Sequence, residues 1–134
     1  MNYMKNIIIA SLILVITSNS LIAQRLKNSS GTTIGYIESG RVKSSSGTTI
    51  GYIEDGRVKN NSGTTIGYFD TNRIRNSSGA TIGYFEDNHV KNASGSTIGY
   101  VEDGRVKSSS GSTFGYFEGV RRIEAVLYFF FFFY

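Results

Sequence analysis

The sequence predicts an all-β protein made of six 16-residue hairpin repeats arranged in a closed, flower-like radial array. One pattern recurs six times between residues 25 and 120, which is typical of a repeat architecture. Each copy holds two hairpin turn signals. Between the turns, apolar residues alternate with polar ones, as they do in half-buried strands. An open β-solenoid of the same units is the alternative arrangement.

Residues 1–23 precede the repeats and have the pattern of a secretory signal peptide. Lys5 supplies a positive n-region, Ile7 to Ile16 form an apolar h-region, and Ala23 stands at a small-residue cleavage site. An h-region of this length is too short for a spanning helix, which needs roughly 20 residues. We therefore expect an exported protein, located in the periplasm or outer envelope or secreted, whose mature chain begins at Gln24.

The mature chain has a weak net charge, which argues against nucleic acid as a partner. Lys5 is the only charged residue before Gln24, so 13 basic and 10 acidic residues remain, a net charge of +3. The signs alternate along each repeat, so no basic face forms. Cysteine is absent, and stability must come from strand pairing and a modest apolar core.

The repeat domain, residues 24–124, contains copies that begin at residues 25, 41, 57, 73, 89 and 105. Apolar positions exchange only among Leu, Val, Ile and Phe, whereas the Ser-Gly and Gly-Tyr pairs are the same in every copy. Each copy has a Ser/Asn-rich run ending in glycine, such as Asn60 to Gly63, which fits a type I turn with a left-handed glycine. Asp-Gly steps such as Asp55-Gly56 predict two-residue hairpin turns.

The two turns together predict a strand register. The expected cross-strand pairs are Glu54 with Arg57, Ile53 with Val58, Lys59 with Thr65, and Val58 with Ile66. The apolar members then share one face of the sheet, and the charged members share the other. Each glutamate therefore faces a basic partner.

The Gly-Tyr step interrupts this alternation. Ile66 and Phe69 are three residues apart, so both cannot point inward along one regular strand. We expect a bend or bulge at Gly67 that returns Phe69 to the core side. Closure of the array is favoured over a solenoid because a ring leaves no exposed edge strand.

The repeated pattern, for example IGYIEDGRVKNNSG at residues 50–63, stands behind a signal peptide and ahead of an aromatic tail. In these features the chain resembles the small exported bacterial proteins, of Bacteroidetes type, described as five-fold β-flowers. The resemblance implies a radial array of hairpins and names no activity. Six copies exceed five-fold symmetry, so the resemblance implies either one copy split across the closure or a sixth copy outside the ring.

The tyrosine of each Gly-Tyr pair is the candidate contact residue for a ligand or partner. A regular array of aromatic rings beside Asn and Ser turns suits a glycan or a peptide. The alternative is that each ring covers the gap left by the neighbouring glycine and packs between units. The six candidates are Tyr36, Tyr52, Tyr68, Tyr84, Tyr100 and Tyr116.

No residue pattern predicts a catalytic, cofactor or metal site. His89, the only histidine, occupies the position of arginine in the other copies and is expected to face Glu86. Acidic pairs such as Glu54-Asp55 are explained by cross-strand charge pairing and turn chemistry rather than by calcium. The serines lack a histidine base or a nucleophile elbow.

The C-terminal tail, residues 125–134 (AVLYFFFFFY), is apolar and mostly aromatic. Three interpretations are open. The tail is a final strand or plug buried at the centre of the array, or it inserts into a membrane or partner or is read by sorting machinery. The third interpretation is an exposed, aggregation-prone segment. We expect a non-enzymatic structural or binding module of the bacterial envelope. The alternative is a membrane-associated or self-assembling protein that acts through this tail.

Overall fold

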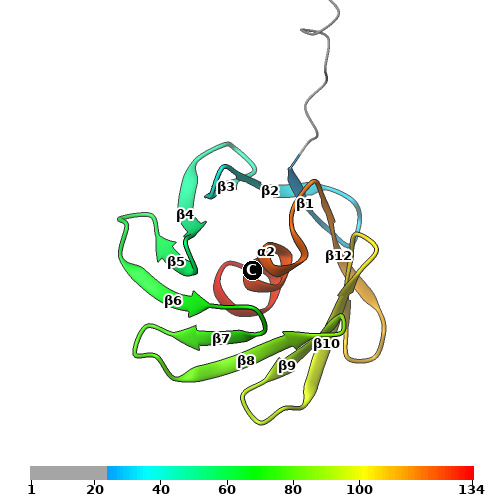
Figure 1. The fold of residues 1–134 in the computed structure, drawn as a ribbon. Helices are drawn as coiled ribbons and strands as arrows, with labels where there is room; N and C mark the ends of the chain where they lie inside the picture. The colour runs from blue at the N-terminus through cyan, green and yellow to red at the C-terminus, as the bar shows by residue number, and fades with distance from the viewer. Residues whose placement is uncertain (1–23) are drawn as a thin grey trace, which may run out of the picture.

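Residues 24–134 form a closed barrel of short antiparallel strands around a central helical segment, in a computed structural model of the chain (Figure 1). The predicted signal peptide, residues 1–23, lies outside the described residues. No helix in residues 24–134 is both long and apolar enough to cross a membrane.

Every repeat contributes one short strand and one longer strand. The short strands are β1 (Arg25–Asn28), β3 (Arg41–Ser44), β5 (Arg57–Asn60), β7 (Arg73–Asn76), β9 (His89–Asn92) and β11 (Arg105–Ser108). The longer strands are β2 (Thr33–Glu38), β4 (Thr49–Glu54), β6 (Thr65–Phe69), β8 (Thr81–Glu86), β10 (Thr97–Glu102) and β12 (Thr113–Glu118). The helical segment consists of α2 (Arg122–Val126) and the π-helical η1 (Leu127–Phe132).

The ring closes by pairing its first strand with its last. β1 lies antiparallel to β12, with Arg25 opposite Glu118. The same pairing occurs inside the chain, where Arg41 lies opposite Glu38. All six copies therefore belong to the ring, which confirms the closed array. The expectations of a split copy and of a copy outside the ring were both wrong, because the closing junction repeats the ordinary junction between units.

Three of the four predicted register pairs are confirmed, and the fourth is wrong. Val58 lies opposite Gly67 rather than Ile66, and the register shifts between Val58 and Lys59. The bulged residue is therefore Ile66, one position before the expected Gly67. With this shift Gly67 and Phe69 point inward on one regular strand, and Tyr68 points outward.

Both turn predictions are confirmed by the backbone. Asp55 and Gly56 have φ values of 52° and 72°, as a type I′ hairpin turn requires at its two central residues. At the other end of the barrel, Gly63 has φ 86° and the Asn60 carboxamide oxygen accepts hydrogen bonds from the N–H groups of Ser62 and Thr64. The two ends of the barrel thus carry different turns.

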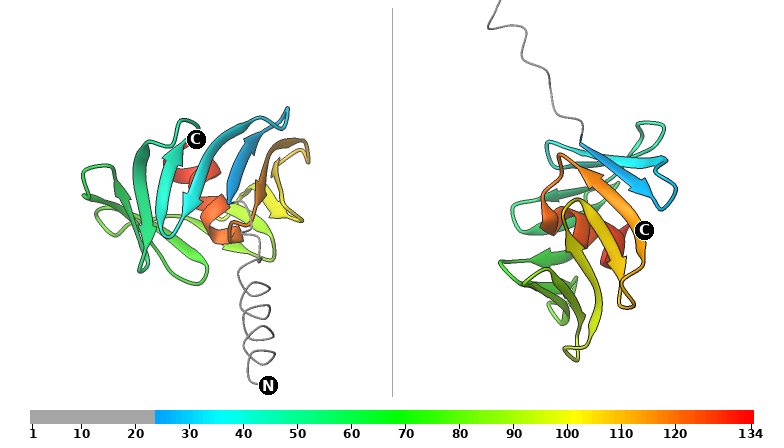
Figure 2. Two further views of the ribbon diagram at one scale, coloured as in Figure 1. Left: turned by 90° about the horizontal axis from the view of Figure 1, so that it is seen from above. Right: turned by 90° about the vertical axis from the view of Figure 1, so that its right-hand side faces the viewer.

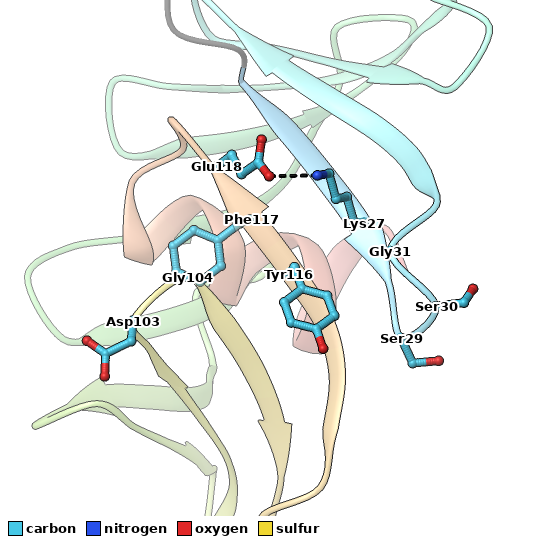
Figure 3. A pocket seen from close by; sticks show the side chains of 9 residues that line it. All are labelled: Lys27, Ser29, Ser30, Gly31, Asp103, Gly104, Tyr116, Phe117 and Glu118. Atoms are coloured by element: carbon cyan, nitrogen blue, oxygen red, sulfur yellow. Dashed lines mark hydrogen bonds and ion pairs between the residues drawn. The ribbon is translucent and has the colours of Figure 1, made fainter.

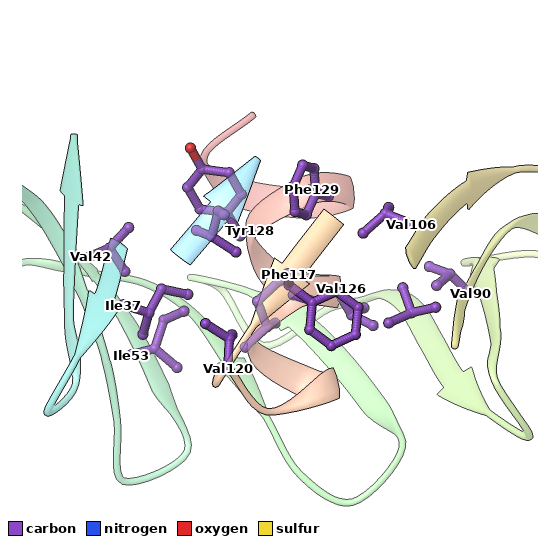
Figure 4. Close-up of a cluster of buried hydrophobic side chains, with 14 of the residues drawn as sticks. Ile37, Val42, Ile53, Val90, Val106, Phe117, Val120, Val126, Tyr128 and Phe129 are labelled. Carbon is purple, nitrogen blue, oxygen red and sulfur yellow. The ribbon is translucent and has the colours of Figure 1, made fainter. Parts of the chain in front are cut away.

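The interior is lined by one fully buried aliphatic residue from every short strand. These residues, all 0% exposed, are Leu26, Val42, Val58, Ile74, Val90 and Val106. They pack against inward residues of the longer strands and against the tail (Figure 4). The six repeats therefore share one core, which no single hairpin could form alone.

The tail occupies the centre of the ring as a helix, so the strand expectation was wrong and the plug expectation is confirmed (Figure 2). Val126, Leu127, Tyr128 and Phe129 are all buried. Every barrel strand already has two neighbours, so no edge is free to pair with a further strand. A buried backbone without a partner strand must satisfy its own hydrogen bonds, and a helix does so.

Candidate functional site

The six candidate tyrosines lie on the outer wall of the barrel, at equivalent positions in every unit. Tyr68 shows the common environment, because it lies opposite Arg57 on one neighbouring strand and Arg75 on the other. Each ring is partly buried between such basic side chains. The ring does not cover the gap at the adjacent glycine, because Gly67 faces inward toward Phe132 of the tail.

Beside each tyrosine, an acidic and a basic residue form an ion pair across two adjacent strands. The pairs are Glu118 with Lys27, Glu38 with Lys43, Glu54 with Lys59, Asp70 with Arg75, Glu86 with Lys91, and Glu102 with Lys107. Their N–O separations range from 2.6 to 3.5 Å. The basic partner is therefore the third residue of the next short strand. Arg57, which was expected to hold Glu54, only lies opposite it in register.

A shallow pocket forms between the tyrosine, the ion pair and the following Ser-Gly turn. Three such pockets, of about 450, 360 and 290 Å³, contain Tyr116, Tyr84 and Tyr100 respectively. Each also contains the carboxylate two residues after its tyrosine and the basic partner of that carboxylate. Serine and glycine of the turn line each of the three pockets as well, and Asp103 and Gly104 are further members of the pocket at Tyr116. One set of side chains thus recurs at three junctions of the wall, and we call it the outer-wall site.

The outer-wall site at Tyr116 exists only because the ring closes. Tyr116 and Glu118 come from the last strand, whereas Lys27 and Ser30 come from the first strand and its turn (Figure 3). Lys27 donates a 2.6 Å hydrogen bond to Glu118. Residues about 90 positions apart therefore reproduce an arrangement that the other units make from neighbouring residues.

The ion pairs shift the acidity of two carboxyl groups. The hydrogen bond and the positive charge of Lys27 lower the pKa of Glu118, and Lys91 does the same to the pKa of Glu86. Because the folded-state pKa lies below the unfolded value, each pair stabilises the fold above about pH 4.3 and loses that contribution as the pH falls. Both carboxylates are exposed, so the effect on stability is small.

We expect Lys27→Gln to return the pKa of Glu118 to its ordinary range, because the mutation removes the ammonium that holds the ionised form. Titration followed by carboxyl NMR shifts measures this change. Lys91→Gln is the matched control and should raise the pKa of Glu86 while leaving the pKa of Glu118 unchanged. An unaltered Glu118 titration in Lys27→Gln would contradict the assignment.

His89 has no catalytic surroundings among the described residues. It lies opposite Glu86, as predicted, but the ion-pair partner of Glu86 is Lys91. The imidazole packs edge-on against Tyr100 with ring centroids 4.9 Å apart. Within residues 24–134, no three His, Cys, Asp or Glu side chains gather closely enough to hold a metal ion.

The six-fold repetition is broken where the tail enters the barrel. Arg122 lies over the Phe85 ring, 5.8 Å from its centroid, and donates a hydrogen bond to Asn88. Asn88 stands in a turn position that glycine occupies at residues 40, 56 and 104. This contact fixes α2 against one side of the ring, next to a further surface pocket that includes Thr71 and Asp87.

Sequence reasoning found the tyrosines, the turns beside them and the paired glutamates, but it chose the wrong basic partner for the glutamates. The basic residue lies seven positions after the tyrosine in the first five units, where it is lysine or Arg75, and for Tyr116 it is Lys27 of the first strand. The Ser-Gly pair begins three positions beyond that basic residue. Their signal was present in the sequence, because this spacing recurs from unit to unit. Only the register showed that the side chains meet on one face.

A family model described as 5-fold beta-flower protein matches residues 23–134. No curated protein and no solved structure matches the chain.

Proposed function

The chain belongs to the 5-fold beta-flower protein family, and from this premise we propose that it is a non-enzymatic, exported binding module of the bacterial cell envelope. Its ligand would be a repetitive glycan held at the outer-wall sites. The observation that carries the proposal is the recurrence of one tyrosine, one ion pair and one Ser-Gly turn in every unit of a closed ring, with a pocket between them at three of the junctions. Export rests on the signal-like pattern of residues 1–23.

The chemistry of the outer-wall site suits a sugar. A partly buried tyrosine offers an apolar face with a polar hydroxyl at its edge. The neighbouring carboxylate, ammonium and serine hydroxyl groups supply both acceptors and donors for sugar hydroxyls. Each pocket is shallow and of modest volume, so a single site would bind weakly.

Repetition compensates for weak single sites. When one long ligand occupies several sites, the later contacts form within the complex at an effective concentration in the millimolar range, and avidity can exceed single-site affinity by about 10²–10⁴-fold. A plugged, closed ring holds its sites at constant separations. The fold therefore favours a polymer with a regular repeat over a small molecule.

A glycan is a better candidate than an extended peptide for a structural reason. Peptides often bind to β-proteins by adding a strand to a free sheet edge. In the described barrel every strand is paired on both sides, so this mode has no place to act. Peptide binding would have to rely on the shallow pockets alone.

Burial of the tail weakens the alternative of a membrane-associated or self-assembling protein. That alternative needs the aromatic residues on the surface, but Val126 to Phe129 are buried in the barrel and Phe130 to Phe133 are only partly exposed. Tyr134 is the large apolar residue that stays exposed, at 65%. One mostly exposed ring beside four partly buried ones is a small contact for a membrane or for a second copy.

We expect the mature chain to bind one class of envelope polysaccharide and to lose affinity stepwise as tyrosines are removed. Purified cell-wall, capsular and lipopolysaccharide-derived glycans would be tested by biolayer interferometry. Replacing one, three and six of the wall tyrosines by serine should reduce affinity progressively, by more than tenfold for the triple variant. Thermal melting would confirm that each variant is folded.

Tyr134→Ser is the matched control, because it removes an exposed tyrosine that belongs to no outer-wall site. Glycan binding that persists after all six wall substitutions would contradict the proposal. Vesicle binding that is abolished by Tyr134→Ser would favour the tail-mediated alternative instead, and tight binding of unstructured peptides would favour a peptide ligand.

A further inference from the structure

Each repeat presents one inward-facing glycine to the tail, and each of these glycines meets a different aromatic ring. The contacts are Gly35 with Tyr128, Gly51 with Phe133, Gly67 with Phe132, Gly83 with Phe131, Gly99 with Phe130, and Gly115 with Phe129. Six consecutive tail residues thus contact six repeats, and each aromatic side chain contacts one glycine.

These glycines are needed for space and not for an unusual backbone conformation. None of the six has a positive φ. A β-carbon placed on Gly51 would lie 2.6 Å from the Phe133 ring and 2.6 Å from the Lys59 carbonyl oxygen of the neighbouring strand. One placed on Gly115 would lie 2.6 Å from the Phe129 ring and 3.1 Å from the Lys27 carbonyl oxygen. Both ring distances are well inside the 3.5–4.0 Å optimum for carbon atoms. By contrast, a β-carbon on the turn residue Gly63 would meet no described atom within 4 Å.

The order of the contacts follows the geometry of η1. After Tyr128 meets the first repeat, Phe129 meets the sixth and each later ring meets the preceding repeat, until Phe133 reaches the second. The tail therefore steps once around the ring. Phe133 and Tyr134 both donate backbone hydrogen bonds to the Tyr128 carbonyl, so this wide helical turn brings its end back above its start.

We propose that the inward glycines form a set of binding notches for aromatic side chains, and that the number of tail rings is matched to the number of repeats. The occupant is the chain's own tail, residues 128–133. The number of aromatic residues in the tail then determines the number of repeats in a completely filled ring, because a ring of six units fills all its notches only with six consecutive aromatic residues. A five-unit member built on the same plan would need five.

The first test asks whether a notch and its ring are specifically coupled. Gly67→Ala should lower the melting temperature by roughly 5–20 °C, because the added methyl group overlaps Phe132. Adding Phe132→Leu should raise the melting temperature above that of Gly67→Ala, since the smaller side chain leaves room. Adding Phe130→Leu, which faces Gly99 on another unit, should lower it further. Equal effects of the two leucine substitutions would overturn the proposal.

The second test changes the number of repeats directly and does not depend on how well Gly67→Ala folds. Deleting residues 57–72 removes one whole repeat and joins the Asp55-Gly56 turn to Arg73, as in the other units. We expect the five-repeat chain that also lacks Phe132 to melt at a higher temperature than the five-repeat chain with all six rings. A five-repeat chain that is equally stable or more stable with the full tail would contradict the matching rule.

Discussion

Removal of residues 125–134 should leave a chain that no longer folds as a stable monomer. The deletion takes away Val126, Leu127, Tyr128 and Phe129, each at most 5% exposed. Burial of a large apolar side chain contributes about 1.5–3 kcal/mol, so these four together contribute on the order of 6–12 kcal/mol. Single domains are stable by only about 5–15 kcal/mol. The deletion would also expose the inner wall of the barrel to water.

Size-exclusion chromatography and thermal melting of residues 24–124 against residues 24–134 measure this effect. We expect aggregation, or loss of the cooperative transition, in the shorter chain. Deletion of Tyr134 alone is the control and should leave the elution volume and the melting temperature nearly unchanged, because that residue is mostly exposed. A shorter chain that remained folded and became more soluble would show that the tail is a contact surface and not a core element.

Leu26→Ala should lower the free energy of unfolding by about 2–5 kcal/mol, the range for Leu→Ala in a packed core. Leu26 is 0% exposed and lies on the strand that closes the ring, opposite Phe117 of β12 and Gly35 of β2. Loss of its side chain leaves a cavity at the junction that holds the two ends of the barrel together. The closing outer-wall site at Lys27 and Glu118 depends on the same junction.

Urea unfolding followed by circular dichroism gives the free energy, and hydrogen exchange locates the weakened strands. Protection should fall first in β1 and β12, because their pairing is not supported by a covalent turn. Ser29→Ala, in an exposed turn position, is the control and should stay within about 0.5 kcal/mol of the parent. An unchanged unfolding midpoint in Leu26→Ala would mean that closure does not depend on this packing.

The outer-wall site was predictable in part. The tyrosines were identified because they recur without variation, and the glutamates were assigned basic partners because their charges alternate. The assignment chose Arg57 for Glu54, because directly opposite residues are the nearest in an ideal ladder. In the structure Lys59 takes that place at 3.4 Å. Lys59 lies opposite Tyr52, two residues before Glu54 on the same strand face, so the ion pair is diagonal and simple alternation does not reveal it.

The sequence by itself determined the repeat, both turn types and the alternation of inner and outer residues. These features depend on local chemistry: glycine and aspartate permit positive φ in a turn, and the two-residue period of a strand separates its faces. The position of the bulge at Ile66, one residue earlier than expected, was the local detail that alternation could not resolve.

Tertiary structure alone decided the helical state of the tail and the role of the inward glycines. An aromatic run such as YFFFFF favours a strand by propensity, but a closed barrel offers no free edge for it to pair with. The buried backbone therefore forms its own hydrogen bonds as a helix. The glycine in each Gly-Tyr pair then leaves the space that a ring of this helix fills, and that contact exists only once the barrel has closed around the tail.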